Sequence, residues 1–376
     1  LGGALVSPLV PGWLARAGAS SPRQAVANDA LAAARRQMGA IPIQSTTLTD
    51  TLTLLMGPGG NVVVLHGDEG KIAIDTFVQG AWDGLKAELD KLGSAPITAA
   101  VDTHWHYDHA DNNASFRRAG AAIVAHENTR KRLTQTHTLL GMEFPAAPPD
   151  ALPTRTFTST HAMDANGEQV ALGYIPPAHT DTDIYIRFAK ADVLHLGDVF
   201  FNGMYPFIDA STGGSIGGMI AGATMALNMA GRNTRIVPGH GPLGDAAALT
   251  RYRDMLVTVR DRVQKLKTAG RTPEQVVAAN PLADLDAPGV ARPGGRPGAE
   301  EGSGRCPAGS RSGGDAQGPS PGERRRCDSL PDQNRPKSNR PAETFGRRAM
   351  GSVRVRQFLP GMPPKQRSPA HRNREA

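Results

Sequence analysis

The chain has 376 residues, of which 39% are hydrophobic and 5% aromatic, and its formal net charge is +7. These fractions are low for a compact enzyme, so we expect part of the chain to lie outside any packed core. No stretch reaches the roughly 18 consecutive apolar residues of a membrane-spanning helix, and no membrane span is predicted.

The part with few apolar residues is the segment 288–376, which is rich in Gly, Pro, Ser and Arg. Residues 292–376 hold 18 basic and 8 acidic residues, a charge of +10, and the chain total of +7 leaves −3 for the remainder. This composition predicts a disordered basic tail or a translation in an altered reading frame. Because the positive charge belongs to the tail, nucleic acid is not an expected partner of the folded part. Both cysteines, Cys306 and Cys327, also lie there, so neither a disulfide nor a thiolate metal ligand is expected elsewhere.

The N-terminal residues 1–19 combine an apolar stretch with small residues at 17–19 that resemble a signal-peptidase site. We therefore predict the remainder of a signal peptide and a periplasmic or secreted protein. A short N-terminal helix and a cytoplasmic protein are the alternative. A polar, Ala-rich lead-in follows over 20–46, and one catalytic domain is predicted over 47–287.

The predicted elements of this domain alternate between strands and helices. Short strands between Gly-rich turns come first, and two strand, helix, strand units follow. Alternation of this kind predicts an α/β protein with two sheets and helices outside them, an αββα sandwich. In chain order, the predicted strands are 47–56, 61–65, 71–75, 97–101, 121–125, 154–158, 169–174, 183–188, 193–196 and 235–237, and the predicted helices are 79–92, 113–119, 127–133, 216–230 and 246–266.

A His-rich loop, with the sequence HWHYDH from His104 to His109, follows directly on the strand that ends at residue 101. Alternate residues of an extended segment point the same way, so His104 and His106 are expected to bind one metal ion. Asp108 and His109, at the turn beyond, would face a second ion. Imidazole and carboxylate without thiolate favour zinc, although manganese or iron would also accept them. Such a concentration of a scarce residue is typical of a metal site rather than of a solvated loop.

Three later loops carry further candidate ligands. His179 lies in PAHTD, Asp198 in LGDV and His240 in VPGHG. Each follows an apolar, strand-like stretch and has Gly or Pro close by, which shapes a tight loop. Taken singly, each is a weak signal, because a lone His or Asp in a turn is usually polar surface.

Taken together and in this order, the motif and the three loops resemble the metallo-β-lactamase superfamily, in which H-x-H-x-D-H is followed by His, Asp and His. The resemblance spans roughly residues 47–266. It implies two zinc ions, one bound by His104, His106 and His179 and the other by Asp108, His109 and His240, with Asp198 bridging them.

A dinuclear centre of this kind implies a hydrolase that acts on a small-molecule substrate. Two ions that share a water lower its pKa, and the resulting hydroxide would attack a polarised carbonyl. Asp108 would orient the hydroxide and relay its proton. The expected scissile bond is an ester, lactone, thioester or amide.

Several residues near the motifs are expected to support the centre. The candidate hydrogen-bond partners of the ligand imidazoles are Asp102, Thr103, Asp181 and Asp183. An apolar part of the substrate would be lined by Met204, Tyr205 and Phe207, and either substrate contact or packing beneath the loop is expected of Trp105 and Tyr107. The histidines expected to be structural or on the surface are His66, His126, His137, His161 and His195.

The superfamily does not by itself name the substrate, since it includes β-lactamases, lactonases, thioesterases, nucleases and iron-dependent oxygenases. A domain without Cys and with Asp198 as a bridging ligand is closer to the lactonases and thioesterases. β-Lactam hydrolysis is the main alternative, because an exported enzyme would meet antibiotics. An iron-dependent persulfide dioxygenase and a non-catalytic metal-binding protein are the others. No sequence feature indicates the oligomeric state.

Overall fold

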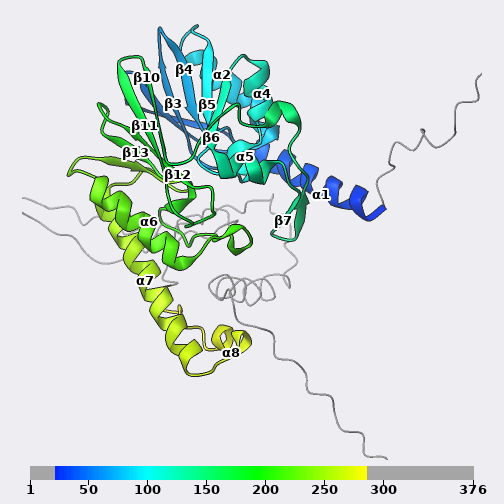
Figure 1. Cartoon of the computed structure of the whole chain (residues 1–376), viewed down its shortest axis with the longest axis vertical. Coiled ribbons are helices and arrows are strands. Elements are labelled where there is room, and N and C mark those ends of the chain that lie inside the picture. Colours follow the sequence, from blue (N-terminus) through cyan, green and yellow to red (C-terminus); the bar gives the residue numbers. More distant parts are fainter. Residues whose placement is uncertain (1–21, 286–376) are drawn as a thin grey trace, which may run out of the picture.

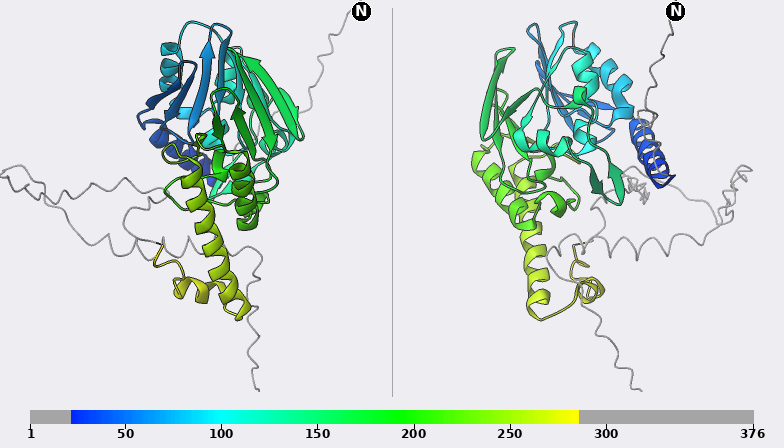
Figure 2. Two further views of the ribbon diagram at one scale, coloured as in Figure 1. Left: turned by 90° about the vertical axis from the view of Figure 1, so that its left-hand side faces the viewer. Right: turned by 45° about the vertical axis from the view of Figure 1, so that its right-hand side comes forward.

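The computed structural model describes residues 22–285. Two sheets pack face to face, with helices on both outer faces (Figure 1, Figure 2), which confirms the predicted αββα sandwich. The predicted signal remnant at 1–19 and basic tail at 288–376 lie outside the described residues, so export and disorder stay predictions. Within 22–285, no helix is long and apolar enough to cross a membrane.

Seven strands form the first sheet, in the spatial order β1 (Gln44–Thr49), β2 (Leu52–Met56), β3 (Val62–Gly67), β4 (Gly70–Ile74), β5 (Ile97–Val101), β6 (Ala122–His126) and β9 (Arg155–Phe157). The first four strands pair antiparallel, and each later strand pairs parallel with its neighbour. Because β4 and β5 are parallel, the residues that follow them emerge at the same edge of the sheet.

The strand predicted over 47–56 is two strands, β1 and β2, joined by a tight turn at Asp50 and Thr51. Thr49 pairs with Leu52, and the ladder is irregular between Thr47 and Thr49. Thr and Leu alternate on both sides of the turn, so the period of two residues continues through it. The turn therefore has no signature in the hydrophobic pattern.

Five strands form the second sheet, in the order β10 (Thr160–Ala165), β11 (Glu168–Tyr174), β12 (Ile184–Phe188), β13 (Val193–His195) and β14 (Arg235–Val237). The first four pair antiparallel, and β13 and β14 pair parallel. Asp198 follows β13 and His240 follows β14, so these two residues also emerge at one edge.

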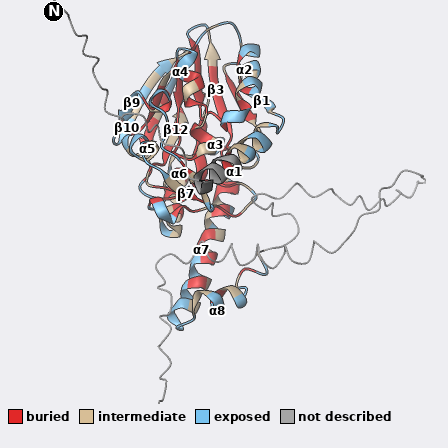
Figure 3. Cartoon of the chain, turned by 90° about the vertical axis from the view of Figure 1, so that its right-hand side faces the viewer, coloured by how far each residue is buried: buried red, intermediate tan, exposed pale blue. Residues whose placement is uncertain are grey.

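Helices cover both sheets, and the buried residues of Figure 3 concentrate between these layers. One apolar cluster lies between the two sheets, another joins the first sheet to its helices, and a third joins the second sheet to its own. The first sheet is covered by α2 (Trp82–Lys91) and α4 (Asn113–Arg118), and the second by α6 (Ile216–Met229) and α7 (Ala246–Thr268). The short helix α8 (Pro273–Ala278) packs against the far end of α7 (Figure 1).

The remaining elements are short or lie beside the sandwich. The helix over residues 22–39 was not predicted, because its apolar residues are mostly Ala and make no clear stripe. A small separate hairpin packs against it through Leu31 and Phe144. These elements are α1 (Pro22–Gly39), α3 (Tyr107–Ala110), α5 (Glu127–Leu133), β7 (His137–Leu139), β8 (Met142–Phe144) and the single turns η1 (Gln79–Ala81), η2 (Pro149–Ala151), η3 (Gly197–Val199) and η4 (Ala210–Thr212).

Candidate metal centre

The structure brings all seven predicted ligands together at one edge of the sandwich. The HWHYDH loop follows β5, and the other three ligands come from loops that follow β11, β13 and β14. They form two groups, within each of which the ligand atoms all lie within 4.8 Å of one another. The first group is His104, His106, His179 and Asp198, and the second group is Asp108, His109 and His240.

Asp198 lies between the two groups. Its Oδ2 is 3.4 Å from Nε2 of His179, and its Oδ1 is 3.5 Å from Nε2 of His240. One carboxylate oxygen therefore faces each group, as a bridging ligand requires. Gly239 makes this approach possible, because a Cβ at that position would overlap Oδ1 of Asp198.

Asp75, the residue after β4, orients two of the imidazoles. Its Oδ2 is 2.7 Å from Nδ1 of His109. The hydroxyl of Thr103 donates to the same oxygen at 2.8 Å, so its own oxygen is left to accept from Nδ1 of His104, 3.0 Å away. Both Nδ1 atoms therefore carry a proton, which leaves Nε2 of each ring as the atom that faces the centre.

His179 is held through its ring and through its backbone. Nδ1 donates to the carbonyl of Phe207 at 2.8 Å, which leaves the lone pair on Nε2. The backbone N–H donates to Asp183 at 2.7 Å, and Thr180 donates to the same carboxyl from its N–H and its hydroxyl. Burial raises the pKa of Asp183 to about 7, against the effect of these hydrogen bonds.

Of the four predicted partners of the ligand imidazoles, Thr103 contacts the ring of a predicted ligand, His104, whereas Asp183 accepts from the backbone N–H of His179. The other two have different partners: Asp102 accepts from the Asn113 side chain at 2.8 Å, and Asp181 pairs with Arg132.

Sequence reasoning misses two carboxylates, Asp75 and Asp209. Asp75 carries a usable signal, since it is an acidic residue at the end of an apolar strand that leads to the same sheet edge as the HWHYDH loop. Asp209, whose Oδ2 is 3.3 Å from Nε2 of His106, carries none.

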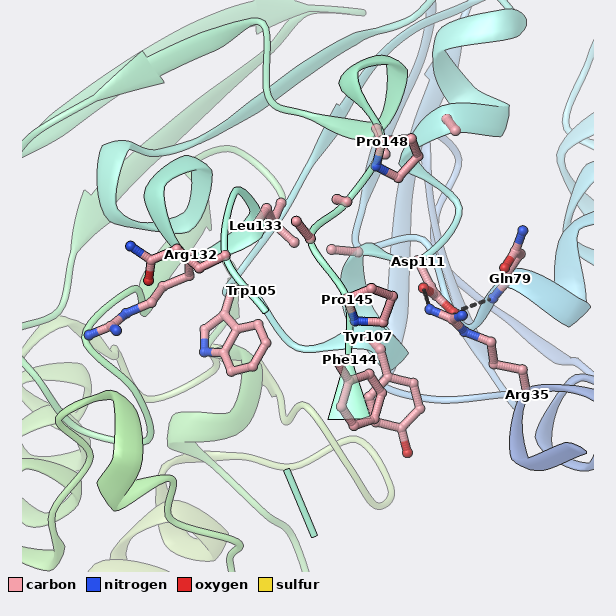
Figure 4. Close-up of a pocket in the computed structure, with 16 residues that line it drawn as sticks. Arg35, Gln79, Trp105, Tyr107, Asp111, Arg132, Leu133, Phe144, Pro145 and Pro148 are labelled. Atoms are coloured by element: carbon pink, nitrogen blue, oxygen red, sulfur yellow. Dashed lines mark hydrogen bonds and ion pairs between the residues drawn. The ribbon is translucent and has the colours of Figure 1, made fainter. Parts of the chain in front are cut away.

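Trp105 and Tyr107 line a pocket of about 170 Å³ that contains none of the seven predicted ligands (Figure 4). Nε1 of Trp105 donates to the hydroxyl of Thr212 at 3.3 Å, and the ring of Tyr107 stacks on Phe144 with centroids 4.8 Å apart. The structure therefore favours packing over substrate contact for both residues.

The donor atoms of the first group fit a cation. Nε2 of His104 is buried and has no hydrogen-bond partner among the described residues. Nδ1 of His106 and Nε2 of His179 lie only 2.9 Å apart, although the opposite nitrogen of each ring already faces an acceptor. A hydrogen bond between them would require a doubly protonated ring, whereas one bound cation would satisfy both lone pairs.

The two groups differ in their charge. Burial lowers the pKa of His104 well below its ordinary value and lowers that of His179 to about 4. In the second group, the neighbouring carboxylates, Asp198 foremost, outweigh burial and raise the pKa of His240 to about 10 and that of His109 well above its ordinary value. At neutral pH the rings of His104 and His179 are therefore ready to bind a cation, whereas His109 and His240 must first lose protons.

The sequence profile of the Metallo-beta-lactamase superfamily matches residues 56–257, more than half of the chain. The chain belongs to this superfamily. With both His/Asp groups intact, this member of the metallo-beta-lactamase superfamily is identified as a metal-dependent hydrolase, as the sequence predicted.

Similar solved structures include two metallo-beta-lactamases and a sulfatase. The metallo-beta-lactamase from Pontibacter korlensis is 16% identical with a TM-score of 0.48, over 57% of this chain and 99% of that chain. The DIM-1 metallo-beta-lactamase is 17% identical with a TM-score of 0.49, over 58% and 99% of the two chains. The sec-alkylsulfatase Pisa1 from Pseudomonas sp. is 16% identical with a TM-score of 0.47, over 63% and 45%.

Gly60, in the loop after β2, lies against the ring of His109, and a Cβ on Gly60 would overlap that ring. The ring of His109 is not free to move away from this Cβ, because its Nδ1 is hydrogen-bonded to Asp75. We expect Gly60→Ala to displace the ring, to lower the free energy of unfolding by about 1–3 kcal/mol and to reduce the bound metal. Urea unfolding and metal analysis measure both effects.

The matched control for this substitution is Gly217→Ala in α6, where a Cβ meets nothing within 4 Å. Alanine favours the helix, so the control should be neutral or stabilising by up to ~1 kcal/mol. Equal stability and equal metal content in the two variants would show that the close approach of Gly60 has no consequence.

Proposed function

We propose that the protein is a dinuclear zinc hydrolase that opens an ester, lactone, thioester or amide bond of a small molecule. The observation that carries the proposal is the pair of His/Asp groups with Asp198 between them. When bound, two divalent ions lower the pKa of a shared water and polarise the substrate carbonyl. One ion would be held by His104, His106 and His179, the other by Asp108, His109 and His240, and Asp198 would contribute to both.

Asp108 lies on the open side of the centre. Its side chain is 15% exposed and that of His240 is 23% exposed, whereas those of the other five ligands are at most 5% exposed. Water and substrate therefore reach the centre past Asp108 and His240. Although burial opposes it, the positive charges of His109 and His240 lower the pKa of Asp108 to about 2, so its carboxylate is ionised in the metal-free protein and can hold a cation or orient a water by accepting a hydrogen bond.

Aromatic rings beside the ligands support a substrate with an apolar portion. Phe201 stacks on His240 with centroids 5.3 Å apart and 16° between the planes, but it is itself buried in the core. Phe207, which is only partly buried, lies 5.9 Å from the ring of His106. Met204 is also partly buried, whereas Tyr205 belongs to the core. We therefore expect neutral substrates with longer acyl chains to be preferred.

The test is hydrolysis by zinc-loaded protein of matched esters, lactones, thioesters and β-lactams, each with short and long side chains. We expect turnover of at least one carbonyl class, with kcat/KM rising by up to about fourfold per added methylene. Turnover confined to β-lactams would favour the β-lactamase alternative, and persulfide oxidation by iron-loaded protein would favour the dioxygenase. Two bound ions without turnover of any substrate would leave a metal-binding protein and contradict the proposal.

A further inference from the structure

The loop from Phe201 to Gly214 contains no ligand, yet it touches two ligands of the first group. The carbonyl of Phe207 accepts from His179, and Oδ2 of Asp209 lies 3.3 Å from Nε2 of His106. The first contact is made by a backbone carbonyl, which no substitution removes. The second is made by the side chain of Asp209, so a substitution of that residue can test it.

Asp209 is held rigidly in place. Its side chain is 3% exposed. Oδ1 accepts from the N–H of Ser211 at 3.0 Å and from its hydroxyl at 2.5 Å, and Oδ2 accepts from the hydroxyl of Thr212 at 2.6 Å. The backbone N–H of Asp209 donates to the carbonyl of His179 at 3.0 Å, which ties the residue to a second ligand. These contacts fix the direction of Oδ2 and favour an ionised carboxylate.

The ionised carboxylate decides which nitrogen of His106 carries the proton. A carboxylate only accepts hydrogen bonds, so the proton must lie on Nε2 and the lone pair on Nδ1. Nδ1 is the atom that lies 2.9 Å from Nε2 of His179, inside the first group. The other tautomer would set two lone pairs against each other at Asp209 and direct a proton at the ligand atoms.

We propose that Asp209 is a positioning residue, which holds His106 in the Nε2–H tautomer and thereby makes Nδ1 available as a metal ligand. The inference rests on the proposed metal centre, but its first readout needs no metal. Partners of this kind change metal affinity by about 10- to 100-fold when they are lost.

Nitrogen-15 NMR of the metal-free protein reports the tautomer of His106 directly, with the ring signals assigned from a His106→Gln variant. In the wild-type protein we expect the proton on Nε2. In Asp209→Asn the new amide can accept from Ser211 and donate to His106, so we expect the proton to move to Nδ1. Zinc affinity, measured by competition with a chelator, should then fall by about 10- to 100-fold.

Ser211→Ala is the matched control, because it removes one donor to Oδ1 and leaves Oδ2 facing His106. We expect the wild-type tautomer and near wild-type zinc affinity. A purely structural role of Asp209 would lower thermal stability in both variants and leave the tautomer unchanged, which would overturn the proposal.

A wild-type His106 with its proton on Nδ1 would also overturn the proposal, and this measurement does not depend on the folding of any variant. Failure of the zinc-loaded protein to hydrolyse any substrate would instead refute the proposed function and leave the tautomer result standing.

Discussion

His106→Ala is expected to remove the ion of the first group and to lower kcat/KM by more than about 100-fold, while the fold stays intact. Loss of a ligand's hydrogen-bond partner alone costs about 10- to 100-fold, so loss of the ligand should cost more. His106 lies in the loop after β5 and outside every strand, so its truncation leaves the pairing of the sheets in place. Metal content, turnover and circular dichroism together measure the effect.

A matched control for this variant is His161→Ala, which removes an imidazole from the edge strand β10, outside both groups. The control should keep its metal and its turnover. Unchanged turnover in His106→Ala, or equal loss in the two variants, would mean that the HWHYDH loop is not the active site.

Metal affinity in the second group is expected to rise steeply with pH. The pKa of His240 is raised from 6.5 to about 10, chiefly by Asp198 against the effect of burial, so this ring is protonated at pH 7 in the metal-free protein. A metal ion binds only the neutral ring and must displace the proton. Affinity should therefore increase about tenfold per pH unit for each proton displaced, until the pH approaches 10.

Zinc titrations at several pH values, repeated calorimetrically in buffers of different ionisation enthalpy, measure this proton release. The first group is the internal control, because the lowered pKa values of His104 and His179 predict that these two rings release no protons near neutral pH. The same protonation of His240 stabilises the metal-free fold below pH 6.5, and this contribution is lost as the pH rises toward 10. Binding of both ions without any dependence on pH would contradict the charge assignment.

The sandwich could be predicted from sequence because its inner strands are short apolar runs between turns. Strand β13 is buried at every residue and β5 at every residue but Thr98, so both stand out from their surroundings. The hairpin of β7 and β8 and the edge strand β10 were not predicted, because they are short or carry polar residues at exposed positions. Their pairing depends on which partners the fold brings to them rather than on their own pattern.

The ligands could be predicted because their signals are local. Four of them share one loop, and His179, Asp198 and His240 each follow a strand. The residues that orient the ligands could not be predicted in the same way, since their contacts join distant loops. Asp209 and His106 are 103 residues apart in the sequence, and no sequence pattern near either residue predicts their contact.

The most direct test of the dinuclear centre is an anomalous X-ray diffraction map, measured at the zinc edge on crystals of the zinc-loaded protein. Two peaks are expected, one among His104, His106 and His179 and the other among Asp108, His109 and His240, with Asp198 in contact with both. A map without a peak among these residues, or with zinc bound only elsewhere on the chain, would contradict the assignment.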